Sequence, residues 1–113
     1  MASIRKTCDV NAVNRVIASD KVTVLVGTQK GCHHCPPWIA KLKQNPPKGV
    51  AIVEIPSKNG KPACEAIQQR LKVKFTPHTV IYKKGKKVAT FNPSSGDVAK
   101  NLEALKRKIA QYQ

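Results

Sequence analysis

The chain alternates between short, continuous apolar runs and segments in which apolar residues recur every three or four positions. Continuous apolar runs are typical of strands buried on both faces, and the wider spacing is typical of amphipathic helices. The pattern predicts strands at 3–7, 22–27, 50–55, 79–82 and 87–91, and helices at 9–19, from about 32 to 44, at 61–72 and from 96 onward. The predicted fold is therefore α/β, a central mixed sheet of four to five strands with helices on both faces.

Local signals fix several of these boundaries. Asp9 is a good N-cap for the first helix. Proline is tolerated only in the first turn of a helix, so Pro36 and Pro37 require the second helix to begin near Cys32. The run 83–86, Lys-Lys-Gly-Lys, is a turn signal between two short strands and predicts an antiparallel hairpin.

Length and composition restrict the class of protein. The 113 residues are enough for one domain, 1–113, and its apolar stretches are much shorter than the ~20 residues needed to span a bilayer. The N-terminal Met-Ala-Ser-Ile-Arg-Lys lacks the apolar segment of a secretory signal. We therefore expect a cytoplasmic monomer that makes no contact with a membrane.

The charge is strongly unbalanced, with 21 Lys and Arg against 6 Asp and Glu and a formal net charge of +15. A field of this sign attracts acidic partners and favours non-specific contact with nucleic acids. Aromatic residues make up only 4% of the chain, and the aromatic pattern of single-strand nucleic-acid binders is missing. The charge predicts either acidic partners or simply a solvated basic surface.

Cys32-His33-His34-Cys35 follows the predicted central strand and stands at the expected start of a helix. The free amides and the positive dipole of a helix N-terminus lower the pKa of a nearby thiol. Cys32 is therefore the expected nucleophile, and Cys35 is expected to resolve the mixed disulfide that Cys32 forms with a partner protein. This chemistry needs no cofactor beyond the redox-active disulfide itself.

Cys-x-x-Cys alone is also compatible with a zinc site. A structural zinc ion usually needs four ligands, and no second Cys-x-x-Cys or His-x-x-x-His is present. Cys8, Cys64 and His78 are scattered, although the fold could bring one of them close. Redox chemistry is favoured with no metal expected, and we interpret Cys8 and Cys64 as small, half-buried hydrophobic residues.

The order of elements, the Cys32–Cys35 run and the segment 75–86, which begins Phe75-Thr76-Pro77-His78, together resemble the thioredoxin family from Ile4 to about Ile109. The resemblance implies a thiol-disulfide oxidoreductase that acts on protein disulfides or dithiols. It further implies that the bond before Pro77 is cis, that Pro77 faces the two cysteines, and that the backbone at Thr76 pairs with the substrate.

Two departures from the family bear on mechanism. Gly31 replaces the tryptophan that thioredoxins place before the nucleophile, and Val26 stands where they carry a buried aspartate that relays a proton. Glu54, inside an otherwise apolar strand, is a candidate replacement for that relay, and a solvated position is the alternative. Trp38 is expected in the core, close enough to the cysteines for its fluorescence to report their redox state.

The dipeptide between the cysteines tunes the redox potential in this family, and protein disulfide isomerases carry a histidine there. A partly protonated imidazole stabilises a neighbouring thiolate and so makes the disulfide a better oxidant. We therefore expect His33 and His34 to make this protein more oxidising than a thioredoxin, unless both are merely exposed polar residues. Thr76 before Pro77 is similar to the isomerases as well.

Two other functions remain open at this stage. One is a metal or iron-sulfur module that uses the Cys-His-His-Cys run within a chain or across a dimer. The other is a basic interaction protein that uses a thioredoxin scaffold to hold an acidic partner or nucleic acid. A glutaredoxin-like use of glutathione is less favoured, because the Gly-Gly pair that follows the proline hairpin in that class is missing.

Overall fold

The computed structural model describes residues 4–29, 31–57, 62–71, 77–93 and 96–113. Five strands and four helices occur in these ranges, in the order β1 (Arg5–Lys6), α1 (Val10–Ile17), β2 (Val22–Gln29), α2 (Cys35–Gln44), β3 (Val50–Ser57), α3 (Pro62–Arg70), β4 (His78–Lys83), β5 (Lys86–Phe91) and α4 (Val98–Ala110). In the described part of the chain, no helix is both long and apolar enough to cross a membrane.

The strands form one mixed sheet in the order β1-β3-β2-β4-β5. β2 runs parallel to β3 and antiparallel to β4, and β4 and β5 form the predicted hairpin. β2 occupies the centre, where its continuous apolar run is buried on both faces. The prediction of a central strand at this place is confirmed.

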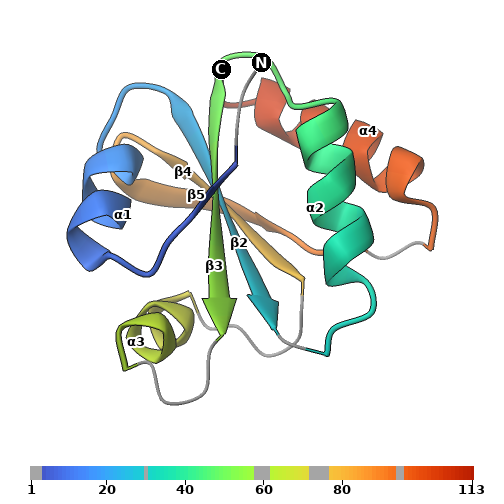
Figure 1. Cartoon of the computed structure of the whole chain (residues 1–113). Coiled ribbons are helices and arrows are strands. Elements are labelled where there is room, and N and C mark those ends of the chain that lie inside the picture. Colours follow the sequence, from blue (N-terminus) through green and yellow to red (C-terminus); the bar gives the residue numbers. More distant parts are fainter. Residues whose placement is uncertain (1–3, 30, 58–61, 72–76, 94–95) are drawn as a thin grey trace.

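Two hydrophobic layers cover the sheet, and Figure 1 shows α2 and α4 on one face with α1 and α3 on the other. Alternate residues of each strand point to opposite faces. Val24, Val26 and Ile52 therefore pack with the α2/α4 layer, while Leu25 and Val53 pack with the α1/α3 layer. This alternation decides which strand side chains can reach the Cys32–Cys35 region.

Turns and caps follow the local chemistry of the sequence. Asp9 Oδ1 accepts hydrogen bonds from the backbone N–H of Asn11 and Ala12 at 2.9 and 3.2 Å, as expected for an N-cap. Lys84 and Gly85 both have positive φ, 52° and 81°, which is the pattern of a type I′ hairpin turn. Both predicted features are confirmed.

The start of α2 differs from the prediction. The helix begins at Cys35, and its first intrahelical bond runs from the N–H of Trp38 to the carbonyl of His34 at 3.3 Å. Cys32 lies before the helix, in a turn in which its N–H donates to the carbonyl of Gln29 at 3.1 Å. The prolines limit how early the helix can begin, because both must stay in its first turn, and a start at Cys35 leaves the preceding residues free to form this turn.

Candidate active site

Cys32 and Cys35 form a disulfide in which their Cα atoms are 5.5 Å apart. Cys32 is half-buried, whereas only 4% of Cys35 is exposed. The difference follows from position, because Cys32 lies in the exposed turn and Cys35 is the first residue of a helix packed on the sheet. A partner thiol or disulfide can therefore reach Cys32 but not Cys35.

The N-terminus of α2 provides a positive electrostatic environment. Pro36 and Pro37 carry no N–H, and they occupy the first turn, where amide hydrogens lack intrahelical partners. His34 is the N-cap residue and makes no side-chain cap bond, and the side chains of His33 and His34 are both exposed. The helix dipole and two solvent-facing imidazoles therefore lie beside Cys32.

Trp38 fixes α2 against the sheet. Its side chain is 1% exposed, and its indole Nε1–H donates to Thr79 Oγ1 of β4 at 3.2 Å. The ring also stacks on Phe91 of β5, with 6.1 Å between centroids. The prediction of a core position for Trp38 is confirmed, and this packing holds the helix start that carries Cys35 at a fixed height above the sheet.

The predicted substrate-binding segment is only partly described. Pro77 is buried just before β4, whereas Phe75 and Thr76 lie outside the described residues, and with them the bond predicted to be cis. His78 is 8% exposed in β4, and its Nδ1 lies 2.8 Å from Asn92 Oδ1. A buried histidine hydrogen-bonded in this way belongs to the scaffold of the sheet.

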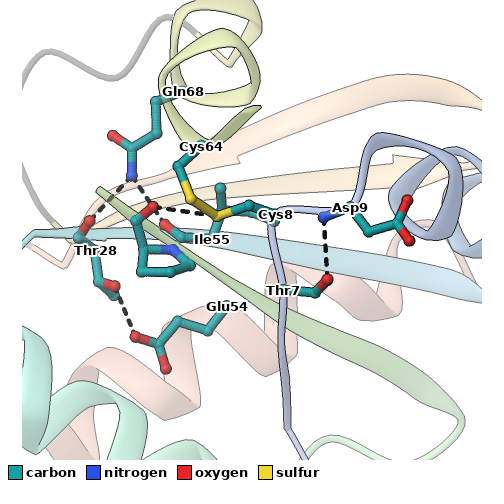
Figure 2. Close-up of a disulfide and its surroundings, with 9 residues drawn as sticks. Thr7, Cys8, Asp9, Thr28, Glu54, Ile55, Cys64 and Gln68 are labelled. Carbon is teal, nitrogen blue, oxygen red and sulfur yellow. Dashed lines mark hydrogen bonds between the residues drawn. A yellow bond between two sulfur atoms is a disulfide. The ribbon is translucent and has the colours of Figure 1, made fainter. Parts of the chain in front are cut away.

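Glu54 is not a lone solvated charge. Thr28 Oγ1 donates to Glu54 Oε2 at 2.7 Å, and Thr28 itself is 5% exposed (Figure 2). Glu54 pairs in register with Val26, the position at which the sequence lacks the family's aspartate. It also shares a strand face with Ile52, which packs in the α2/α4 layer. The carboxylate therefore lies on the sheet face that α2 covers.

The interpretation of Cys8 and Cys64 as unpaired hydrophobic residues is wrong, because they form a second disulfide (Figure 2). Their Cα atoms lie 4.9 Å apart across a sequence separation of 56 residues. Cys64 is 3% exposed in α3, and Cys8 Sγ lies 3.6 Å from the carbonyl oxygen of Pro56 at the end of β3. The even number of cysteines was the one signal in the sequence for this pair.

Gln68 is a residue that sequence reasoning missed. Its Nε2 donates to the carbonyl of Thr28 at 3.0 Å and to that of Ile55 at 2.9 Å, so one side chain of α3 links β2 and β3 (Figure 2). It stands four residues after Cys64, on the same face of the helix. Nothing in the local pattern distinguishes it from its neighbour Gln69, which is exposed.

The described residues offer no donor set for a metal centre. Among them, no three side chains of His, Cys, Asp or Glu come close enough together to hold a metal ion. The two disulfides moreover engage all four cysteines of the chain, and thiolates are the ligands that zinc and iron-sulfur clusters need.

Solved structures provide a comparison for the fold. The chain is similar to thioredoxin from Trypanosoma brucei brucei, with 17% identity and a TM-score of 0.77 over 96% of this chain and 89% of that one. It is also similar to the Malassezia sympodialis thioredoxin Mala s 13, with 21% identity and a TM-score of 0.73 over 99% and 92%. Thioredoxin f from spinach chloroplast is similar as well, with 18% identity and a TM-score of 0.73 over 96% of this chain and 95% of that one.

No protein-family model and no curated protein sequence matches the chain. At these identities the structural likeness establishes the architecture, which is the thioredoxin fold. The predicted α/β sheet with helices on both faces is confirmed, and the sheet has five strands.

Proposed function

From the thioredoxin fold and its Cys32–Cys35 disulfide, we propose that the chain is a thiol-disulfide oxidoreductase acting on protein disulfides or dithiols. The observation that carries the proposal is the unequal exposure of two bonded cysteines at the start of α2, with Cys32 half-buried and Cys35 4% exposed. This arrangement separates the two steps of exchange. The accessible sulfur meets the partner, and the protected sulfur completes the reaction within the chain.

In the reducing direction, the Cys32 thiolate attacks one sulfur of a substrate disulfide and releases the other as a thiolate. The Cys35 thiol then loses its proton and attacks Cys32 Sγ, which breaks the mixed disulfide and releases the second substrate sulfur. Two electrons pass to the substrate, and the Cys32–Cys35 disulfide forms. The reverse sequence oxidises a substrate dithiol, and buried Pro77 with the adjoining backbone at Thr76 is the proposed platform for the substrate.

The disulfide is proposed to be more oxidising than that of a thioredoxin. Equilibration with reduced and oxidised glutathione, followed by mass tagging of free thiols and by Trp38 fluorescence, should give a potential well above about −270 mV and closer to about −180 mV. The reason is that His33 and His34, both exposed beside Cys32, stabilise the thiolate and hence the reduced form.

Replacing both histidines with alanine should lower this potential toward that of a thioredoxin. Gln44→Ala, at the other end of α2, is the matched control and should leave it unchanged. A wild-type potential near about −270 mV would contradict the tuning by histidine but not the oxidoreductase function. Failure to form a reversible Cys32–Cys35 disulfide would contradict the function itself.

Glu54 is the proposed proton relay for Cys35. It lies on the sheet face covered by α2, and its bond from the buried Thr28 hydroxyl gives the carboxylate a fixed orientation. A carboxylate in such a place can accept the proton that Cys35 loses on attack and return it when Cys35 is released. Loss of this carboxylate in Glu54→Gln should therefore slow the reduction of the Cys32–Cys35 disulfide.

A basic surface is proposed to attract acidic protein substrates electrostatically. Lys83 Nζ donates to the carbonyl of Tyr112 at 2.7 Å, and Gln113 Nε2 donates to that of Lys48 at 2.8 Å. The β4–β5 turn and the α2–β3 loop therefore meet the end of the chain after α4. The proposed cationic surface comprises Lys48 and Lys83, which make these contacts, and the exposed Lys84 and Lys86 of the adjoining turn.

Salt should slow the reduction of an acidic protein disulfide roughly tenfold between low and physiological ionic strength, because screening removes the long-range attraction. The control is a neutral, low-molecular-weight disulfide, whose rate should not change with salt. Equal salt dependence for both substrates would contradict a role of the cationic surface. If Cys32→Ser retained all cellular activity, the basic interaction protein would replace the oxidoreductase.

A cytoplasmic location stays a prediction. Glutathione and thioredoxin keep most thiols reduced there, so a second disulfide would need protection. The 3% exposure of Cys64 would provide part of that protection.

A further inference from the structure

We propose that Gln68 is a positioning residue for the Thr28–Glu54 acid–base pair, and that the Cys8–Cys64 disulfide holds α3 so that Gln68 can act. This proposal rests on the oxidoreductase function proposed above and deepens it. It assigns the Cys8–Cys64 disulfide a role in the proton transfer between Glu54 and Cys35. Figure 2 shows the Cys8–Cys64 disulfide together with Gln68, Thr28 and Glu54, the three side chains through which we propose that it acts on Cys35.

The first step of the connection is the pair of hydrogen bonds that Gln68 Nε2 donates. A single amide nitrogen can reach the carbonyls of Thr28 and Ile55, at 3.0 and 2.9 Å, only while β2 and β3 keep a fixed separation at this end of the sheet. These carbonyls belong to neighbouring parallel strands, in which Gly27 pairs with Ile55 and Thr28 with Pro56. Gln68 therefore fixes the end of β2 just before the turn to Cys32.

The second step runs through Thr28. Its carbonyl accepts from Gln68 on the α3 side, and its hydroxyl donates to Glu54 Oε2 at 2.7 Å. Strand alternation places the Thr28 and Glu54 side chains on the sheet face covered by α2, the helix that begins at Cys35. Holding the Thr28 backbone thus orients the carboxylate on the opposite face.

The third step is the anchoring of α3. Cys64 stands one turn before Gln68, and its disulfide to Cys8 attaches the helix to the segment between β1 and α1. A hydrogen bond from Arg70 Nη1 to Asn14 Oδ1, at 2.8 Å, joins α3 to α1 at an exposed position. Of these two attachments only the disulfide is covalent. Its reduction leaves α3, and Gln68 with it, held by noncovalent contacts alone.

The chemical consequence is clearest when a dithiol reduces the oxidised protein. A dithiol thiolate attacks Cys32 Sγ, the Cys32–Cys35 bond breaks, and Cys35 leaves as a thiolate that takes a proton from Glu54. The second thiol of the dithiol then attacks the mixed disulfide, releases Cys32, and closes the dithiol into a cyclic disulfide. A displaced Thr28 leaves Glu54 without its orientation, so the protonation of Cys35 slows.

Other titratable groups near Glu54 are few. Lys6 is its register partner on the edge strand β1, and β2 carries no titratable residue. His33 and His34 precede α2 but are exposed. In the described part of the chain, none of these groups is linked to Gln68 by a hydrogen bond. A change in the pH profile caused by a Gln68 substitution therefore points to the Thr28–Glu54 pair.

The test follows Trp38 fluorescence as dithiothreitol reduces the fully oxidised protein at about pH 5 to 8, with rates divided by the thiolate fraction of the reagent. Glu54→Gln should slow the reduction about tenfold or more and alter the dependence of the rate on pH, because the proton donor to Cys35 is lost. Gln68→Met, which keeps the length of the side chain but has no N–H donor, should reproduce this altered profile. Gln69→Met, at the exposed neighbour, should match wild type.

Removal of the Cys8–Cys64 disulfide is the second part of the experiment. Cys8→Ser combined with Cys64→Ser should give the same altered profile as Gln68→Met, because both release Thr28. Gln68→Leu repeats the test with a side chain that likewise lacks the donor and adds no titratable group. Circular dichroism of each variant shows that the slowed protein is folded.

A wild-type profile in Gln68→Met and Gln68→Leu would overturn the proposal. So would an equal slowing at every pH in the Gln68 variants, with the shape of the wild-type profile retained, since that result indicates a structural effect alone. An unaltered profile in Glu54→Gln would overturn it as well, by removing the group that Gln68 is said to orient. If dithiothreitol did not reduce the Cys32–Cys35 disulfide of the wild type at all, the oxidoreductase function itself would fail.

Discussion

Cys32→Ser is expected to lower the rate of protein disulfide reduction at least about 10³-fold, to the background rate of the reagent, because the accessible nucleophile is lost. Turnover of a protein disulfide such as insulin, with dithiothreitol as the electron donor, measures the effect. Cys35 cannot substitute for Cys32, since this first residue of α2 is only 4% exposed. The hydroxyl of serine remains protonated at neutral pH and does not attack a disulfide.

Cys35→Ser should behave differently, and the contrast makes the test specific. Cys32 keeps its exposed position in the turn and still attacks the substrate, but nothing within the chain resolves the mixed disulfide. Mass spectrometry should therefore find substrate covalently attached at Cys32. Thermal unfolding of both variants serves as the control for folding. Full turnover in Cys32→Ser would show that the Cys32–Cys35 pair is not the active site.

The second large effect concerns stability. Combining Cys8→Ser with Cys64→Ser should lower the free energy of unfolding by about 2–4 kcal/mol, because the disulfide closes a loop of 56 residues and so restricts the unfolded chain. In a domain of this size the loss corresponds to a fall in melting temperature of roughly 10 °C. Denaturant titration of the oxidised proteins gives the free energies directly.

Cys32→Ser combined with Cys35→Ser is the matched control. It also removes one disulfide, but the loop closed by a sequence separation of 3 is short, so the expected loss is about half as large. Equal stability of the wild type and the Cys8/Cys64 double variant would show that the second disulfide does not form in solution. Mass tagging of free thiols in the denatured wild type checks this independently.

Local sequence determined the elements and the place of Cys32 and Cys35. The nearly continuous β-branched run at 22–27 carries no charged residue and does not alternate between apolar and polar positions, which favours an interior strand. The two prolines after Cys35 can stand only in the first turn of a helix, and this restriction places Cys35 at a helix start, whereas Cys32 lies in the turn before it. Each of these inferences depends on residues that are neighbours in sequence.

Three features were decided by tertiary structure alone. Cys8 finds Cys64 because β1, at the sheet edge, and α3 meet beside the end of β3. Gln68 differs from Gln69 only because one faces the carbonyls of Thr28 and Ile55 while the other faces solvent. The Thr28 bond that gives Glu54 a fixed place results from the parallel register of β2 and β3.

The physical reason for this division is the range of the forces involved. Helix caps, turn types and apolar periodicity reflect interactions within a few residues of one another, so the sequence records them directly. A disulfide across 56 residues, or an amide that joins two strands, depends on how whole elements pack. No local pattern encodes such a meeting, and it becomes visible only once the sheet has assembled.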